Sequence, residues 1–145
     1  MSRMLDLIRK MQRGELPPPP VATLVGFELT AVEPGHAVVE LQATERHANP
    51  MGTLHGGILC DVADAAMGMA WAATLDEGET FTTLELKINF LKPVWTGGLV
   101  ATGRVVKGDR TIGLVECDIV DAKQRLVARA SSTVMTLRGE HASGR

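Results

Sequence analysis

Residues 58–75 of this chain form a nearly unbroken apolar run, ILCDVADAAMGMAWAATL. A helix that is apolar on all sides is a buried helix, so the rest of the chain must be built around it. The carboxylates in the run are Asp61 and Asp64, and a buried carboxylate costs free energy unless it is paired or hydrogen-bonded. The nearest downstream lysine or arginine is Lys87. Carboxylates without a cation, directly after His55-Gly56-Gly57, indicate a catalytic site.

The length and composition are those of one globular domain. A domain of 145 residues buries roughly 68–70% of the surface of its unfolded chain. The formal net charge of −2 gives no support to nucleic-acid binding. We find no signal-peptide pattern and no run of about 18 apolar residues. We therefore expect a cytoplasmic protein without a membrane segment. Cys60 and Cys117 are predicted to be small buried hydrophobes rather than a disulfide.

The first residues predict an appended helix. Met4, Leu5, Ile8 and Met11 recur at helical spacing, and the chain then reaches Gly14 and the proline run at 17–20, which cannot continue a helix. Residues 1–22 are therefore assigned as an N-terminal helix with a stiff, proline-rich linker. Its simplest role is to cover apolar surface, and the alternatives are regulation or capping of a substrate.

Beyond residue 23 the pattern predicts strands on both sides of the buried helix. Turn signals at Glu33-Pro34-Gly35, 107–110 and 121–124 separate them. Residues 82–90 alternate apolar and polar side chains with a period of two. The predicted strands are 24–32, 36–41, 82–90, 99–106, 111–120 and 125–137. We predict a polar loop at 45–54 and a polar, frayed tail at 138–145.

This order of elements predicts an α+β fold. A long helix buried on every side needs an antiparallel sheet that curls around it, with the short N-terminal helix as an addition. A single sheet of this size leaves long edges and an incompletely covered helix. We therefore expect the chain to form a dimer.

Several motifs in fixed order resemble the hotdog-fold thioesterases, in particular the acyl-CoA thioesterases of phenylacetate-degradation type. They are Asn49, the Gly-x-x-His-Gly-Gly run at 52–57, Asp64 nine residues after His55, and Phe90-Leu91-Lys92-Pro93. The resemblance covers residues 23–137. It implies a sheet wrapped around a central helix, homodimers that join their sheets edge to edge, frequent homotetramers, and active sites shared across the dimer interface. It also implies an acyl-CoA substrate.

The chemistry of thioester hydrolysis assigns roles to the start of the helix. The first N–H groups of a helix have no partner within it and carry the positive end of its dipole. Glycines at 56 and 57 let a substrate carbonyl approach this backbone. The Gly56 N–H is the predicted oxyanion donor, which agrees with the family's donor position, and Gly57 is placed with the substrate-binding residues. A tight turn against the sheet would be the purely structural reason for both glycines.

Asp64 matches the acid of the family, which acts as a general base on water or as a direct nucleophile. Burial would raise its pKa, which suits a base working near neutral pH. The sequence leaves the two mechanisms open. Asp61 lies one turn earlier on the same side of the helix. Asp61 is the second candidate for the catalytic acid, but a carboxylate in the first turns of a helix also favours its dipole and can bind loop N–H groups. The family position belongs to Asp64, so we place Asp61 with the substrate-binding residues.

Three further residues complete the predicted catalytic set. Asn49 matches a family amide that orients the water or the carbonyl, although asparagine is also a common turn residue. His55 is expected to orient the loop by hydrogen bonds, in either a structural or a catalytic role. Thr83 matches a family hydroxyl that helps to place water, although threonine also favours strands. His47 matches no family role and is expected to be a loop residue.

The CoA and acyl parts of the substrate need different binding groups. The phosphates of CoA need cations, which surface strands and turns supply at Lys92, Arg104, Lys107, Arg110, Arg125 and Arg129. None of these can be chosen from the sequence. Gly68, with Ala65, Ala66 and Ala72, leaves room along the helix for a bulky or aromatic acyl group, although alanines also serve close packing.

We expect neither a metal nor a cofactor, because the spacing of His55, Asp61 and Asp64 is not that of a zinc site. The alternative function is a non-catalytic acyl-CoA-binding module, a sensor or structural partner. Such a module does not need a carboxylate facing the thioester, so Asp64 favours the enzyme. A hydratase on the same fold is a third hypothesis, which the position of Asp64 after the glycines fits less well.

Overall fold

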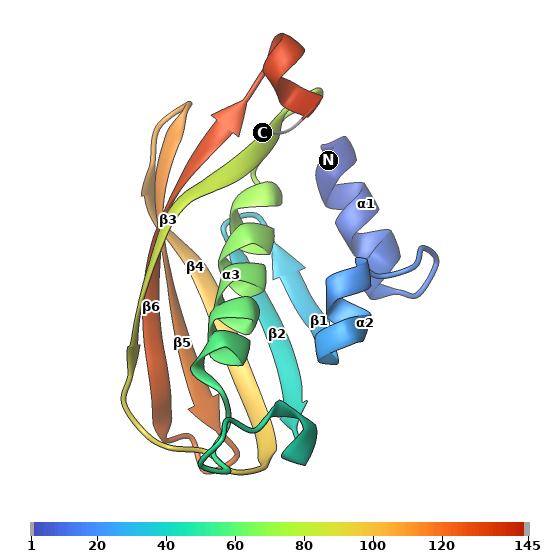
Figure 1. Cartoon of the computed structure of the whole chain (residues 1–145). Helices are drawn as coiled ribbons and strands as arrows, with labels where there is room; N and C mark the ends of the chain where they lie inside the picture. The colour runs from blue at the N-terminus through green and yellow to red at the C-terminus, as the bar shows by residue number, and fades with distance from the viewer. Residues whose placement is uncertain (1, 144–145) are drawn as a thin grey trace.

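The computed structural model describes residues 2–143, in which one long helix lies against a curved sheet (Figure 1). Residue 1 of the predicted appendage and residues 144–145 of the predicted tail lie outside the described residues. The helices are α1 (Arg3–Gln12), α2 (Pro20–Val25) and α3 (Gly56–Ala72). The strands are β1 (Phe27–Glu33), β2 (His36–Ala43), β3 (Thr80–Phe90), β4 (Gly97–Gly108), β5 (Ile112–Asp121) and β6 (Leu126–Leu137). Short 3-10 turns occupy Glu45–His47 and Gly139–Ser143.

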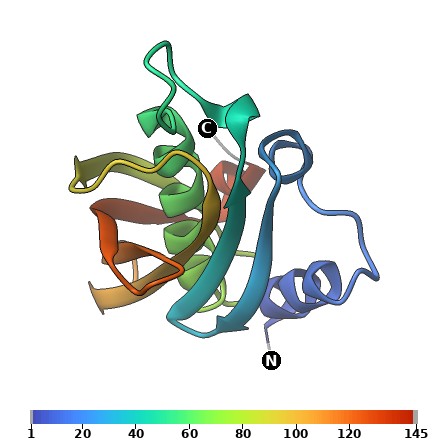
Figure 2. The ribbon, with the colours of Figure 1, turned by 90° about the horizontal axis from the view of Figure 1, so that it is seen from below.

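The six strands form one antiparallel sheet in the order β1-β2-β4-β5-β6-β3. The sheet curves around α3, as Figures 1 and 2 show from two directions. The predicted α+β class and the antiparallel sheet wrapped around a central helix are therefore confirmed. β1 and β3 form the two edges of the sheet, so each edge leaves backbone groups without a strand partner within the described chain.

Close packing of α3 on the sheet explains where the chain needs glycine. A Cβ at Gly103 on β4 would lie 2.4 Å from the carbonyl oxygen of Ala66. The ring of Trp71 occupies the space beside Gly108 and Gly113 in the same way, and its Nε1 donates to Thr136 Oγ1 at 3.2 Å. In the second half of α3, residues 66–72, every residue except the partly buried Met69 is buried.

The N-terminal segment contains two helices instead of one. Ser2 caps the start of α1: its hydroxyl accepts from the Leu5 N–H at 3.2 Å. The helix buries Leu5 and Ile8 against the core. α2 begins with Pro20, a residue favoured in the first turn because its missing N–H has no partner there anyway. The prediction of a strand from Leu24 is therefore wrong. Gly26, at φ 95°, ends α2, and β1 starts at Phe27.

The predicted boundary between the N-terminal segment and the thioesterase-like domain, at residues 22 and 23, falls inside α2. The predicted domain limits themselves remain a prediction.

The C-terminal tail differs from its prediction. Residues 139–143 form a 3-10 turn instead of a frayed end, and Thr80 Oγ1 donates to the carbonyl of Ala142 at 2.7 Å. Across residues 2–143, we find no helix with the length and apolarity needed to cross a membrane.

β3 carries the main departure from the predicted strand pattern. Thr83 pairs with Val134 and Glu85 with Thr133, which leaves Leu84 as an extra residue in a β-bulge. An inserted residue reverses the alternation of side chains along a strand. The prediction of uninterrupted alternation over 82–90 is therefore wrong, and the side chains that face α3 differ on the two sides of Leu84.

Candidate active site

The first turn of α3 presents one free backbone donor. His55 caps the helix: its Nδ1 accepts from the Gly57 N–H at 2.8 Å, and its carbonyl accepts from Ile58 at 3.0 Å. The His55 N–H donates to the carbonyl of His47 at 2.9 Å. Within residues 2–143, the Gly56 N–H has no partner. Gly56 therefore offers an unused donor at the positive end of the helix dipole.

Side chains pack closely at this end of α3, so a larger residue at either glycine would require a neighbouring ring to shift. A Cβ at Gly56 would lie 2.8 Å from the Phe90 ring, and a Cβ at Gly57 would lie 2.9 Å from His55 Nδ1. The close approach at Gly57 follows from the cap itself. Sequence reasoning missed the capping role of His55, because histidine is not among the usual N-cap residues.

One face of α3 is open to solvent in the single chain. Gly57, Asp61 and Asp64 are exposed, while neighbours such as Val62 and Ala63 are buried. The prediction of a helix buried on every side is wrong for the single chain, because the sheet covers the opposite face and its curvature stops short of this one. Within residues 2–143, Asp61 and Asp64 form no ion pair.

Asp64 has an unusual electrostatic environment for an exposed residue. The protein around its carboxyl group displaces enough water to raise its pKa above the ordinary value. The hydrogen bond from Thr83 Oγ1 to Asp64 Oδ1, at 3.3 Å, opposes this rise. The negative charge of Asp61 adds to the rise. A carboxylate made more basic in this way is suited to accept a proton or to attack a carbonyl.

The bulge at Leu84 lets side chains from both ends of β3 face α3. Before the bulge, Thr83 bonds to Asp64 and the Phe81 ring lies against Gly68; after it, Phe90 covers Gly56. A regular strand could not direct both the odd-numbered Thr83 and the even-numbered Phe90 to one face. The structure thus brings Thr83 and Asp64, two members of the predicted catalytic set, into hydrogen-bond contact. A bulge leaves little signal in an alternating sequence, and this explains why the pattern alone did not find it.

The loop before α3 uses its polar groups internally. Asn49 Nδ2 donates to Thr53 Oγ1 at 2.8 Å, and Asn49 Oδ1 accepts from the Met51 N–H at 2.9 Å. In the single chain Asn49 therefore acts as a turn residue. His47 has a larger role than predicted: its Nδ1 accepts from Thr44, and its Nε2 bonds to the carbonyl of Val25 at 2.7 Å. His47 joins this loop to the end of α2.

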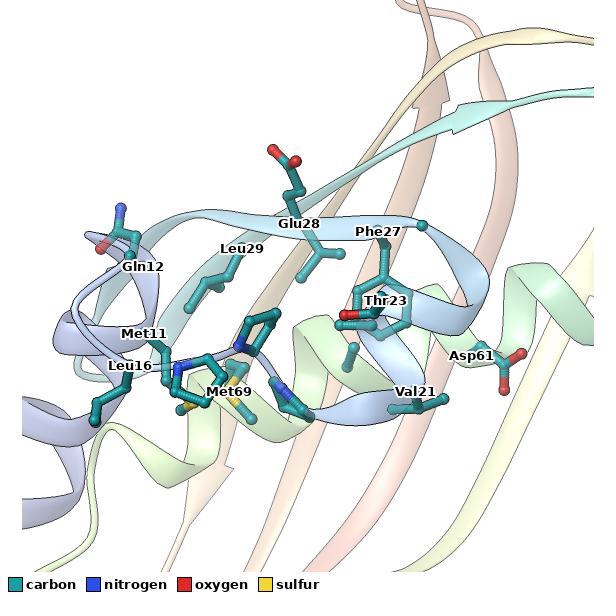
Figure 3. Close-up of a pocket in the computed structure, with 18 of the residues that line it drawn as sticks. Met11, Gln12, Leu16, Val21, Thr23, Phe27, Glu28, Leu29, Asp61 and Met69 are labelled. Carbon is teal, nitrogen blue, oxygen red and sulfur yellow. The ribbon is translucent and has the colours of Figure 1, made fainter.

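The room predicted along α3 at Gly68 is filled in the single chain. Gly68 is buried, and the Phe81 ring fills the volume beside it, 3.2 Å from where a Cβ would stand. A cavity of about 1000 Å³ lies instead between the N-terminal segment, β1 and α3. Asp61, Asp64 and Ala65 line it from α3, and Figure 3 draws most of its lining. The described residues include no group of three His, Cys, Asp or Glu side chains placed to hold a metal ion.

Most of the candidate CoA cations already have carboxylate partners. Lys92 and Arg125 both contact Asp121, whose pKa falls to about 2 through hydrogen bonds from the Arg125 backbone and these neighbours. Arg104 and Arg129 bind Asp118. Among residues 2–143, Lys107 and Arg110 form no carboxylate pair. The structure thus does not select one cation for the phosphates.

Gly56 and Asp64 of one chain are too far apart to act on the same carbonyl. Eight residues at a rise of about 1.5 Å separate them by roughly 12 Å along the helix axis. An oxyanion donor and a base must both lie within hydrogen-bond reach of the reacting group. A site that uses both residues therefore requires a second copy of the chain.

A family model described as the thioesterase superfamily matches residues 51–128, which include the capped helix, Asp64 and Thr83. The chain is 30% identical over 110 residues to the 1,4-dihydroxy-2-naphthoyl-CoA hydrolase of Listeria monocytogenes, across 76% of this chain and 89% of the relative. It is also 30% identical over 108 residues to acyl-coenzyme A thioesterase PaaI of Escherichia coli, across 74% and 75% of the two chains.

A solved structure shares the fold over most of the chain. The phenylacetic acid degradation-related protein of Ralstonia eutropha superposes with a TM-score of 0.81 at 33% identity, covering 88% of this chain and 98% of that one. The predicted resemblance to thioesterases of phenylacetate-degradation type is therefore confirmed.

Proposed function

Because the chain belongs to the thioesterase superfamily, we propose that it hydrolyses acyl-CoA thioesters to a free acid and CoA. The observation that carries this proposal is Asp64. Its carboxylate has a raised pKa, a hydrogen bond from Thr83 and no cationic partner in the described chain, and it lies at the edge of a large cavity. The relatives that hydrolyse CoA esters support the same reaction class.

The proposed reaction adds one water across the C–S bond. In the general-base form, Asp64 takes a proton from water as the water oxygen attacks the thioester carbonyl. The Gly56 N–H stabilises the negative charge that develops on the carbonyl oxygen. The C–S bond then breaks, the acid is released, and CoA leaves as a thiolate that takes up a proton. In the nucleophilic form, Asp64 attacks first and water then hydrolyses the acyl–aspartate anhydride.

The remaining site residues are proposed to support these two. Thr83 keeps the Asp64 carboxylate oriented, and His55 holds the first turn of α3 so that the Gly56 N–H stays free. Asn49 is proposed to help position the carbonyl or water, and Gly57 and Asp61 to contact the substrate. The buried position of Gly68 gives it an indirect part, through the Phe81 ring.

The same geometry leads us to propose a homodimer in which Gly56 of one subunit faces Asp64 of the other. The open face of α3 and the free edge of β3 would be the natural contact surfaces, and Leu84 and Phe90 expose apolar area there. Two dimers would form the tetramer. Light scattering after gel filtration tests this against multiples of 15.5 kDa; a Leu84→Asp variant that runs as a folded monomer would support the edge contact.

Thiol release from a panel of acyl-CoAs tests the activity itself. We expect Asp64→Asn to lower kcat by at least about 10²-fold and Asp61→Asn to lower it far less. Equal losses, or release that survives Asp64→Asn, would contradict the role of Asp64. Tight binding of CoA esters without hydrolysis would favour a non-catalytic acyl-CoA-binding protein. A covalent adduct seen by mass spectrometry after rapid quenching would select the nucleophilic form.

A further inference from the structure

The cavity beside Asp64 is closed on its outer side by the N-terminal segment. Residues 13–19, which we call the N-terminal strap, join α1 to α2 and arch away from β1 (Figure 2). Six of the seven strap residues line the cavity of about 1000 Å³, with Met11 and Gln12 before them and residues 21–23 after them. The floor comes from β1 and the far wall from α3, where Ala65 and Met69 lie one turn apart.

The strap is fixed at both ends. On the α1 side, Gln12 Nε2 donates to the carbonyl of Thr30 on β1 at 2.8 Å, and Arg9 pairs with Glu33 at 3.3 Å. On the α2 side, the carbonyl of Val25 bonds to His47 Nε2 at 2.7 Å. Between these points, the prolines at 17–19 restrict the backbone. A wall held in this way can define the size of a ligand.

The lining is mostly apolar, with Gln12, Thr23 and four carboxylate residues as its polar side chains. Figure 3 shows Met11, Leu29 and Met69 reaching the same space from α1, β1 and α3. The charged residues of the described lining are Glu15, Glu28, Asp61 and Asp64, with no Lys or Arg among them. Figure 3 shows the Glu28 carboxylate pointing away from the space that Leu29 enters. Glu15 is paired with Arg13, which lowers its pKa and keeps it ionised. The cavity therefore suits an apolar group and repels an anionic one.

We propose that this cavity holds the acyl group of the thioester, and that the N-terminal strap makes the enzyme selective for long or bulky acyl groups without a negative charge. The inference rests on the proposed hydrolysis and adds its substrate class. The volume lies at the upper end of the usual range for small-molecule sites, about 300–1000 Å³. An acyl group whose carbonyl lies at Asp64 would extend directly into it.

Steady-state kinetics over a series of straight-chain acyl-CoAs gives the first test. Burial of each added methylene should raise kcat/KM by up to roughly fourfold, from butyryl to decanoyl, until the cavity is full. Adipoyl-CoA serves as a matched anionic substrate for hexanoyl-CoA, because both carry six-carbon chains. We expect it to react at least tenfold more slowly.

Leu29→Trp gives the second test by filling the cavity from β1. We expect kcat/KM for decanoyl-CoA to fall at least tenfold while the value for butyryl-CoA stays within threefold. Glu40→Trp is the matched control, since it adds the same ring at an exposed position of β2 outside the lining. A triple change of Pro17, Pro18 and Pro19 to glycine loosens the strap without touching the floor. It should reduce the preference for long chains in the same direction.

The outcomes separate this inference from the activity on which it rests. Hydrolysis of no acyl-CoA would overturn the proposed function. Hydrolysis with equal kcat/KM across the chain lengths, or with adipoyl-CoA as good as hexanoyl-CoA, would overturn the inference alone. A Leu29→Trp enzyme that loses butyryl and decanoyl activity equally, while its circular dichroism and Tm match the control, would also overturn it.

Discussion

The first half of α3, Gly56–Ala65, and the second half, Ala66–Ala72, are both apolar in sequence but lie in different surroundings. The second half packs against β4 and β5, where the Trp71 ring lies beside Gly108 and Gly113. A Cβ at Gly103 would lie 2.4 Å from the carbonyl oxygen of Ala66. The first half exposes Gly57, Asp61 and Asp64 and leaves the Gly56 N–H free. One helix thus anchors the fold with one half and presents reactive groups with the other.

The contrast between the two halves shows that an apolar helical sequence need not be buried within its own chain. In the second half, the alanines and Gly68 permit close packing against the sheet and the Phe81 ring. In the first half, the same low polarity leaves a helix face that the chain itself does not cover. A face of this kind with two carboxylates needs a ligand, a second subunit, or both. The predictions below change one half at a time.

The largest effect is expected at the start of the helix. Gly56→Pro removes the free N–H at a position where proline suits a helix, and His55 already has the extended backbone that precedes proline (ψ 130°). We expect kcat to fall by about 10²–10³-fold. Gly56→Ala is the control, because its Cβ meets the same Phe90 ring but its N–H remains. Equal losses in both variants, measured by thiol release, would remove Gly56 from the oxyanion site.

A stability effect is expected in the second half. Met67 is fully buried, and Met67→Ala should lower the free energy of unfolding by about 2–5 kcal/mol through the cavity it leaves. Met69→Ala makes the same chemical change at a partly buried position and should cost less. Urea unfolding measures both. A larger loss at Met69 than at Met67 would contradict the deeper burial of Met67 within the second half.

A smaller effect concerns the pH dependence. Asp64 must be ionised to act, so activity falls as the pH drops through its raised pKa. The Thr83 hydrogen bond lowers that pKa, so Thr83→Val should raise it further. The acidic limb of kcat/KM against pH should then move to higher pH, while the rate on the alkaline plateau changes only several-fold. A limb that stays in place or moves to lower pH would show that the Thr83 bond does not favour the carboxylate.

Much of this arrangement could be predicted from the sequence. The apolar run predicted α3, the alternating segments predicted the strands within a few residues, and the ordered motif predicted the fold. The motif also placed Thr83 and Asp64 in one catalytic set, but it did not predict the hydrogen bond between them. The predicted features depend on local periodicity or on a spacing that the family retains.

The features that were missed depend on long-range geometry. The bulge at Leu84 arises from pairing with β6, and α2 begins at a proline that the pattern assigned to a linker. The exposure of Asp64 and the closing of the cavity by the strap depend on where the sheet ends and where α1 docks. None of these leaves a periodic signal. The positions of Phe81 and Phe90 follow directly from the bulge and were missed with it.

Complementation of two inactive variants tests the shared site most directly. A purified heterodimer of one Asp64→Asn subunit and one Gly56→Pro subunit contains one site with both native groups, if Gly56 of one chain serves Asp64 of the other. A symmetric dimer has two such sites, so the heterodimer should recover about half of the wild-type activity, while each parent homodimer stays inactive. A heterodimer as inactive as its parents would mean that the two residues do not meet across the interface, and would contradict the account.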